Sequence, residues 1–220
     1  MTETIDTNKI TIAFSSPYSI DFSDLSKKLE DRGYKPPKDG AVRLNISDTG
    51  EPVPIQRLCK GSIDLHYVKE NGFLSIQSKE SIEMLEELKS LYKIATKLPS
   101  TTSNVIWFEI NYSSRVLPKK HPLDIVSSSN KASSFFEEIS GLKSRYFSRS
   151  ICSFGGELPD EPLNKIRDWV HATVAVFVPN PRYYQIRIVC RRKTIDEIIE
   201  FNRRMPSFIE TIADPDSWVE

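Results

Sequence analysis

The chain of 220 residues runs twice through the same order of strand and helix patterns. In each half a strand pattern precedes a helix pattern, three further strand patterns follow, and an amphipathic helix closes the half. The halves share this order but no residue-level identity. We therefore expect an α+β protein built from two βαβββα units, residues 1–100 and 101–220, either as two domains or as one continuous domain. Mostly antiparallel strands would form one sheet or two, with the helices packed on one face.

The first half contains four stretches of strand-like alternation: 9–15, 42–46, 61–69 and 73–77. Asp21 offers a side-chain cap to a helix that ends near Gly33, and Ser78 offers one to a longer helix. Asn71 and Gly72 both tolerate positive φ, so they predict a tight turn between the last two strands. The expected buried stripe of the longer helix is Ile82, Leu85, Leu88, Tyr92 and Ala95.

The second half repeats this order. Its strand patterns cover 105–112, 145–154, 170–178 and 183–192. A helix pattern between the first two strands is centred on Phe135, Phe136 and Ile139. Thr194 and Glu197 have the spacing of a capping box, which opens a final amphipathic helix that we expect to be bent or interrupted at Pro206.

Charge and cysteine content limit the class of protein. Lysine plus arginine and aspartate plus glutamate number 30 each, so no overall field draws the chain to nucleic acid or an anionic membrane. The longest aliphatic run, 174–178, is too short to span a bilayer, and no export signal is recognisable. Three cysteines without CxxC spacing form no disulfide framework. We expect a cytoplasmic protein without a membrane partner.

The sequence lacks the motifs of several common nucleotide-binding, hydrolase and metalloprotease families. It contains no phosphate-binding P-loop, no dinucleotide-binding glycine motif in a strand-to-helix turn, no GxSxG and no HExxH. The three histidines, His66, His121 and His171, lack metal-ligand spacing. We predict neither a metal nor a cofactor.

One tripeptide, Asp48-Thr49-Gly50, has the residue order of an aspartic-protease turn. An aspartic protease pairs two such turns to activate water, but the chain has one copy, preceded by Ser47 and followed by Glu51. We interpret the tripeptide as a surface turn in which Gly50 supplies positive φ, and we predict that Asp48 is not catalytic.

A first site hypothesis comes from strand periodicity. Asp64 and His66 lie on one face of their strand, joined by Ser75 and Gln77 if the next strand pairs in register. In the strand at 105–112, the residues opposite the apolar face are Trp107, Glu109 and Asn111. The weak catalytic candidates are Asp64, His66 and Glu109, and the ligand-binding candidates are Trp107, Asn111 and Gln77. Ordinary solvent exposure explains the same alternation.

A second hypothesis comes from basic residues near the C-terminus. Arginines are interleaved there with tyrosines, a mixture that suits phosphate contact and base stacking by a single-stranded nucleic acid. The candidates are Arg187, Arg191, Arg192 and Tyr183. Acidic neighbours weaken the hypothesis, and on a strand Arg192 would point away from Arg187 and Arg191.

Our leading hypothesis is a non-catalytic ligand-binding or protein-interaction module, because the expected sheet offers a broad face and no catalytic constellation stands out. An exposed apolar patch would favour protein interaction, a deep pocket with perturbed carboxylates an enzyme, and a continuous basic stripe nucleic acid. The sequence leaves open the function, the ligand, whether the chain is an enzyme, and whether it forms homo-oligomers.

Overall fold

The computed structural model describes residues 2–38, 44–46, 50–118, 138–139, 148–155 and 166–213. Asp48 and His121 lie outside these residues, as do Phe135 and Phe136. Residues 138–139 of the helix expected there are helical. Gly50 has a φ of +84°, as predicted for the turn.

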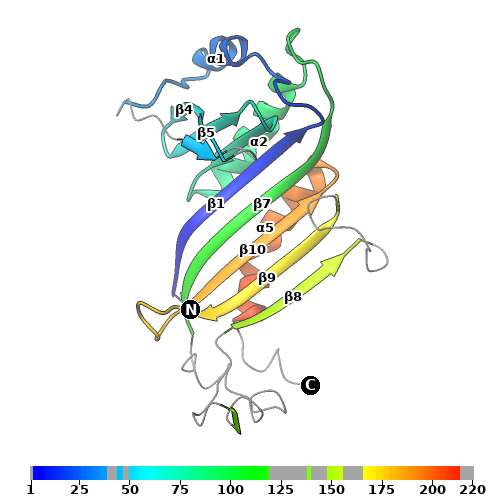
Figure 1. Ribbon diagram of the computed structural model, residues 1–220. Helices are drawn as coiled ribbons and strands as arrows, with labels where there is room; N and C mark the ends of the chain where they lie inside the picture. Colours follow the sequence, from blue (N-terminus) through cyan, green and yellow to red (C-terminus); the bar gives the residue numbers. More distant parts are fainter. Residues whose placement is uncertain are drawn as a thin grey trace.

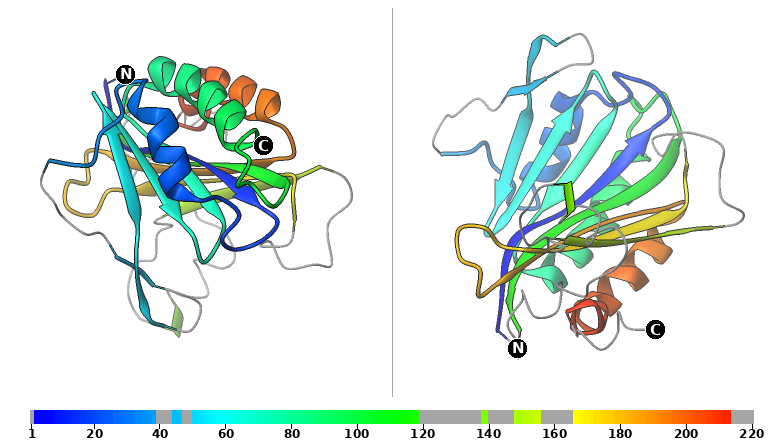
Figure 2. Two further views of the ribbon diagram at one scale, coloured as in Figure 1. Left: turned by 90° about the horizontal axis from the view of Figure 1, so that it is seen from above. Right: turned by 60° about the horizontal axis from the view of Figure 1, so that its bottom comes forward.

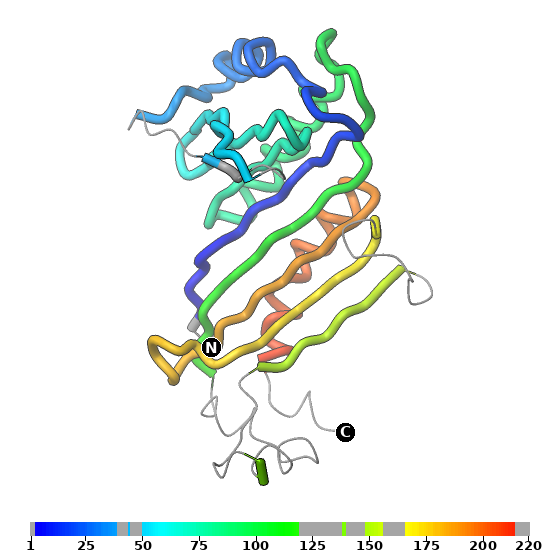
Figure 3. The backbone as a smooth tube through the Cα atoms, in the orientation of Figure 1, coloured from blue at the N-terminus to red at the C-terminus, as the bar shows by residue number. Residues whose placement is uncertain are grey.

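Eight strands form one antiparallel sheet in the order β4-β5-β6-β1-β7-β10-β9-β8 (Figure 1). The strands of the first half are β1 (Thr2–Phe14), β4 (Gln56–Lys60), β5 (Ile63–Val68) and β6 (Phe73–Gln77). Those of the second half are β7 (Val105–Leu117), β8 (Ser148–Phe154), β9 (Trp169–Val176) and β10 (Tyr184–Arg192). The long strands β1 and β7 lie side by side at the centre (Figure 3).

Three described helices cover one face of this sheet: α1 (Phe22–Glu30), α2 (Ser81–Ala95) and α5 (Ile195–Ile212) (Figure 2). Along each strand, side chains point alternately to the helix-covered face and to the other face. Ile10 and Ile12 of β1 both point to the helix-covered face and are fully buried. One cluster of buried residues joins Leu25 of α1, Leu88 of α2 and Ile198 of α5. The α+β class, the large antiparallel sheet and the one-sided helices are therefore confirmed, and the two halves of the chain share the one large sheet.

Two helix starts follow the sequence signals. The Asp21 carboxylate accepts a hydrogen bond from the Ser23 amide at 2.8 Å, and Gly33 has a φ of +85° beyond the end of α1. Thr194 and Glu197 form the predicted capping box at α5. The last helix is continuous from Ile195 to Ile212, so Pro206 does not interrupt it.

The second strand of the first half differs from the prediction. Within the stretch 42–46 only β2 (Leu44–Ile46) is a described strand, and it pairs with β3 (Pro52–Pro54) in a separate two-stranded sheet. The place beside β5 is taken by β4, which we did not predict. In β4 only Leu58 is buried, because the strand lies at the sheet edge, and one apolar residue gives no alternation to detect.

The start and buried face of α2 also differ. The N-cap is Glu80 rather than Ser78, whose hydroxyl instead accepts a hydrogen bond from the Glu80 amide at 3.0 Å. Ile82 is 80% exposed, whereas Met84 is fully buried. Residues two apart on a helix are rotated by about 200°, so these two cannot share a face. The observed stripe is Met84, Leu88, Leu91 and Ala95.

The turn between β5 and β6 keeps the predicted register with different backbone geometry. Gly72 has a φ of +65°, but Asn71 does not take positive φ. Asp64 pairs with Gln77 and His66 with Ser75, as expected. No helix in the described part of the chain is both long and apolar enough to cross a membrane.

Candidate functional site

We define the open face as the face of the eight-stranded sheet opposite α1, α2 and α5. The strand registers bring eight of the predicted site residues to it: Asp64, His66, Gln77, Trp107, Glu109, Asn111, Arg187 and Arg191. Two predicted residues lie elsewhere. Arg192 is on the helix-covered face, where its guanidinium carbon is 5.9 Å from the centre of the Phe201 ring. Tyr183 lies just before β10.

Side chains on the open face form cross-strand rows, and we number three of them along β1, beginning at Thr11 and going toward its N-terminus. The first row is Arg57, His66, Ser75, Thr11, Glu109, Arg191, Trp169 and Phe154. The second row is Cys59, Asp64, Gln77, Lys9, Asn111, Val189, His171 and Cys152. The third row is Thr7, Ser113, Arg187, Thr173 and Ser150.

The three rows differ in burial. Most of the first row is buried although no described helix covers this face: Thr11, His66, Ser75, Trp169 and Arg191 are 5–8% exposed. Large side chains also cover small ones in the adjacent row, as at Ala13, which is fully buried between the paired Phe73 and Trp107. In the third row Arg187 and Ser150 are exposed. The accessible part of the open face is therefore the end that carries the third row.

The first polar cluster joins β4 and β5. Arg57 Nη2 lies 2.8 Å from Asp64 Oδ2, and His66 Nε2 lies 3.0 Å from the same oxygen. Burial alone would raise the pKa of the Asp64 carboxyl, but the hydrogen bonds from His66 and Arg57 outweigh it and hold that pKa well below its usual range. A carboxylate with so low a pKa is a weak proton acceptor.

The second polar cluster joins β7, β9 and β10. Arg191 donates from Nη2 and Nε to Glu109 Oε2 at 2.6 and 3.0 Å, and Asn111 Nδ2 donates to Glu109 Oε1 at 2.9 Å. The guanidinium carbon lies 4.1 Å from the centre of the Trp107 ring and 5.7 Å from that of Trp169. Both oxygens of Glu109 are thus occupied, and both indoles are engaged by the same arginine.

The two carboxylates predicted as an acid/base pair are not neighbours. Asp64 is on β5 and Glu109 on β7, with β6 and β1 between them. Three strand spacings place them about 14 Å apart or more. The Thr11 and Ser75 hydroxyls, 2.9 Å from each other, fill the interval. The structure therefore brings Asp64 to His66, but it does not bring Glu109 to either.

The predicted arginines also separate. Arg191 is held by Glu109, and Arg192 Nη1 bonds to Asp168 on the other side of the sheet. Arg187 is exposed on the open face, where it donates to Gln185 Oε1 at 3.3 Å. It has no acidic partner among the described residues.

The prediction missed several residues of the open face. Lys9, Ser113 and Thr173 lie beside Arg187 or one row away, and their strand periodicity could have placed them there. Arg57 could not be placed, because its strand was not predicted. Trp169 starts β9, and its buried Nε1 has no hydrogen-bond partner in the part of the chain that the structure describes.

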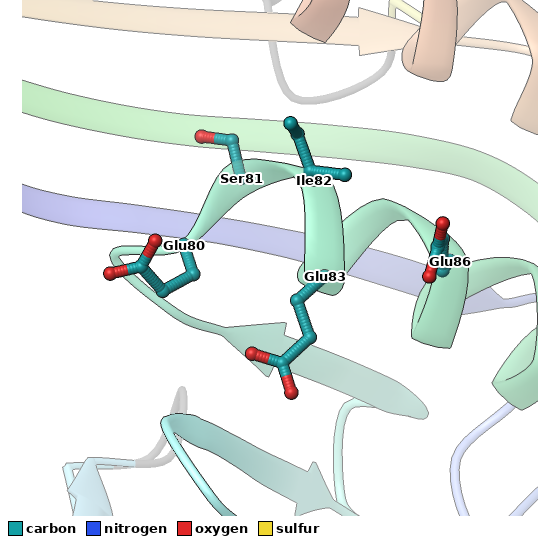
Figure 4. A pocket seen from close by; sticks show the side chains of 5 residues that line it. All are labelled: Glu80, Ser81, Ile82, Glu83 and Glu86. Carbon is teal, nitrogen blue, oxygen red and sulfur yellow. The ribbon is translucent and has the colours of Figure 1, made fainter.

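Two hollows lie beside helices α2 and α5. One, of about 500 Å³, is at the start of α2 and is lined by Glu80, Ser81, Ile82, Glu83 and Glu86, whose carboxylates point in different directions (Figure 4). The other, of about 210 Å³, is beside the N-terminus of α5. Its Asp168 and Arg192 pair with each other, and its Glu197 belongs to the capping box. Neither hollow gathers uncommitted catalytic groups, and no metal-binding group of His, Cys, Asp or Glu occurs among the residues described.

Comparison with known proteins identifies no family. No protein-family model and no curated protein matches the chain. Among solved structures it is similar to one named Methanococcus jannaschii TBP, at 14% identity and a TM-score of 0.36 over the full length of both chains. A likeness at that TM-score supports no conclusion about this chain.

Proposed function

We propose that the protein is a non-catalytic binding module made of two βαβββα units, residues 1–100 and 101–220, whose open face receives an anionic partner. The observation that carries the proposal is the state of the charged side chains on that face: every described acid is paired with an arginine, while Lys9 and Arg187 are left as excess positive charge.

The strand order supports two equivalent units in one sheet. Outward from the centre, the first half runs β1-β6-β5-β4 and the second runs β7-β10-β9-β8. In each half the first strand is central, the second lies at the edge, and the fourth returns beside the first. A long helix then follows, α2 in one half and α5 in the other.

The state of the carboxylates argues against an acid/base enzyme at the open face. Asp64 is bonded to Arg57 and His66, and Glu109 is bonded to Arg191 and Asn111. A general base needs a free lone pair near the proton that it removes. These carboxylates instead fix the positions of neighbouring side chains, which favours a binding role.

The open face and helix α5 carry opposite net charges. The basic residues of the open face are Lys9, Arg57, Arg115, Arg187 and Arg191, and the acidic ones are Asp6, Asp64 and Glu109. Between its bounds α5 carries four acidic residues and two basic ones: Asp196, Glu197, Glu200, Glu210, Arg203 and Arg204. Although the net charge of the chain is zero, the open face is positive and helix α5 is negative. A positive face favours an anionic partner.

The open face is poor in exposed apolar groups. Among the described residues, the exposed large hydrophobic ones are Tyr18, Leu44, Ile82, Leu117, Ile139, Ile151 and Val178. Of these, only Leu117, at the end of β7, occupies an open-face strand position of the large sheet. Protein interfaces usually have an apolar or aromatic centre, so a polar anion fits this face better than an apolar protein surface does.

Retention on immobilised heparin, a polyanion, tests the proposal. We expect the double variant Lys9→Gln with Arg187→Gln to elute at clearly lower salt than the wild type, because both excess charges are lost. The matched control, Arg203→Gln with Arg204→Gln, removes two exposed charges from α5 and should elute at nearly the wild-type position. Equal shifts in the two variants, or no shift in the first, would contradict the proposal. Melting curves establish that both variants are folded.

A further inference from the structure

We infer, resting on the proposed function, that the third row is a phosphate-contact site for the backbone of a double-stranded nucleic acid. Ser113, Arg187, Thr173 and Ser150 stand in cross-strand register on β7, β10, β9 and β8. Neighbouring strands are about 4.8 Å apart, so the four residues line up over roughly 14 Å.

The chemistry of the row is that of phosphate contacts. An arginine fork matches the geometry of phosphate oxygens, and serine and threonine hydroxyls are common donors to them. Thr173 Oγ1 lies 3.1 Å from Ser150 Oγ and 3.4 Å from His171 Nε2, so further donors join the row from the side. Lys9 adds a second cation in the second row, two strands from Arg187.

Among the described residues, the neighbours of Arg187 on the open face supply no acid to compensate its charge. On one side, the second-row residues of the same four strands are Asn111, Val189, His171 and Cys152. On the other side, the next row is Arg115, Gln185, Ala175 and Ser148. Neither set contains an acid. The described acids of the open face on β1 and β7 are both paired: Glu109 is held by Arg191, and Asp6 by Arg115 at 2.7 Å.

The lack of aromatic rings in the third row favours a duplex over a single strand. Proteins that hold single strands stack the bases on aromatic rings. On the open face, Trp107 and Trp169 are 8% and 7% exposed and hold Arg191 between them. The third row contains no aromatic residue. Its small hydroxyl side chains leave room for the close approach of a charged, stacked helix.

Fluorescence anisotropy with a labelled duplex of about 20 base pairs, a single strand of equal length and polyglutamate as competitor tests the inference. We expect salt-sensitive binding that is tighter for the duplex. Arg187→Gln should reduce the slope of log affinity against log salt by about one, since one phosphate contact is lost. Thr173→Val should weaken binding severalfold without changing that slope, and the control Arg203→Gln should change neither.

Tighter binding of the single strand, an unchanged slope in Arg187→Gln, or equal competition by polyglutamate would overturn the inference. These failures are separable from failure of the proposed function. If the open-face variant loses heparin retention but the wild type does not bind the duplex, the open face still takes an anion and only the duplex assignment is wrong. If heparin retention is also insensitive to Lys9 and Arg187, both proposals fail.

Discussion

The guanidinium carbon of Arg191 lies 4.1 Å from the centre of the Trp107 ring, on the face of the sheet that no described helix covers. The same guanidinium is bonded to Glu109, and the two charged side chains are only 9% and 15% exposed. An ion pair so well shielded is a structural element, and it leads to the first prediction.

Removing Arg191 should destabilise the protein strongly, because Glu109 would be left as a buried charge without its partner. We expect Arg191→Met to lower the free energy of unfolding by about 3–5 kcal/mol. The double variant Arg191→Met with Glu109→Gln should recover a large part of that loss. Urea titration of the single and double variants measures both effects. Additive losses would show that the pair is not coupled.

Asp64 should make stability depend on pH in the acid range. Because its pKa is lowered in the folded state, its contribution is fully present above the unfolded value of about 3.9 and is lost as pH falls below that value toward the folded pKa. Asp64→Asn should therefore be less stable than the wild type at pH 6, and the difference should shrink below about pH 4. Urea titrations from pH 7 to 3 test this, with Glu210→Gln, an exposed site, as control. A difference that stays constant with pH would be contrary to this linkage.

The helix faces predict different costs for truncation. Leu88 and Ile198 are fully buried, so alanine at either should cost about 2–5 kcal/mol through lost burial and a cavity. Ile82, 80% exposed on the same helix as Leu88, is the matched control and should change stability by less than about 0.5 kcal/mol as alanine. Denaturant titration distinguishes the three. A loss at Ile82 comparable to that at Leu88 would place the buried stripe of α2 elsewhere.

Alanine substitutions at two glycines with positive φ distinguish the cost of backbone strain from the cost of a steric collision. At Gly33, with φ +85°, an added Cβ meets nothing within 4 Å, so Gly33→Ala should cost only the left-handed strain of about 1–2 kcal/mol. At Gly72, with φ +65°, the Cβ would collide with the backbone oxygen of Ser16. Gly72→Ala should therefore lower the melting temperature considerably more than Gly33→Ala. Equal shifts would mean that the Ser16 backbone moves aside freely.

The sequence predicts this fold well wherever a strand has an apolar and a polar face. Leu65 and Tyr67 alternate with Asp64 and His66, and that period of two placed β5 and its polar face correctly. The helix caps at Asp21 and Thr194 were also predicted correctly, because a side-chain cap is a signal local to the first helical turn. The edge strand β4 and the first turn of α2 were not predicted, because at Leu58 and Ile82 the contacts that decide burial come from elsewhere in the fold.

The open face could be predicted residue by residue but not as an arrangement. Periodicity assigned Glu109 and Arg191 to it, yet their pairing joins residues 82 positions apart through the register of β7 and β10. The prediction that Glu109 and Asp64 belong to one acid/base site is wrong, because strands β6 and β1 lie between their strands. Strand order is set by long-range pairing, and no local pattern in the sequence reports it.

The central pairing of β1 with β7 has a consequence for protein engineering. Each strand has 13 residues, and their register runs from Thr2 opposite Leu117 to Phe14 opposite Val105. A chain cut near residue 100 would leave each fragment with a long strand whose backbone groups have lost their partners. An exposed strand edge of this kind readily pairs with another strand through its free backbone N–H and C=O groups. The two fragments should therefore recombine when mixed, which makes this junction a suitable point for a split-protein complementation pair.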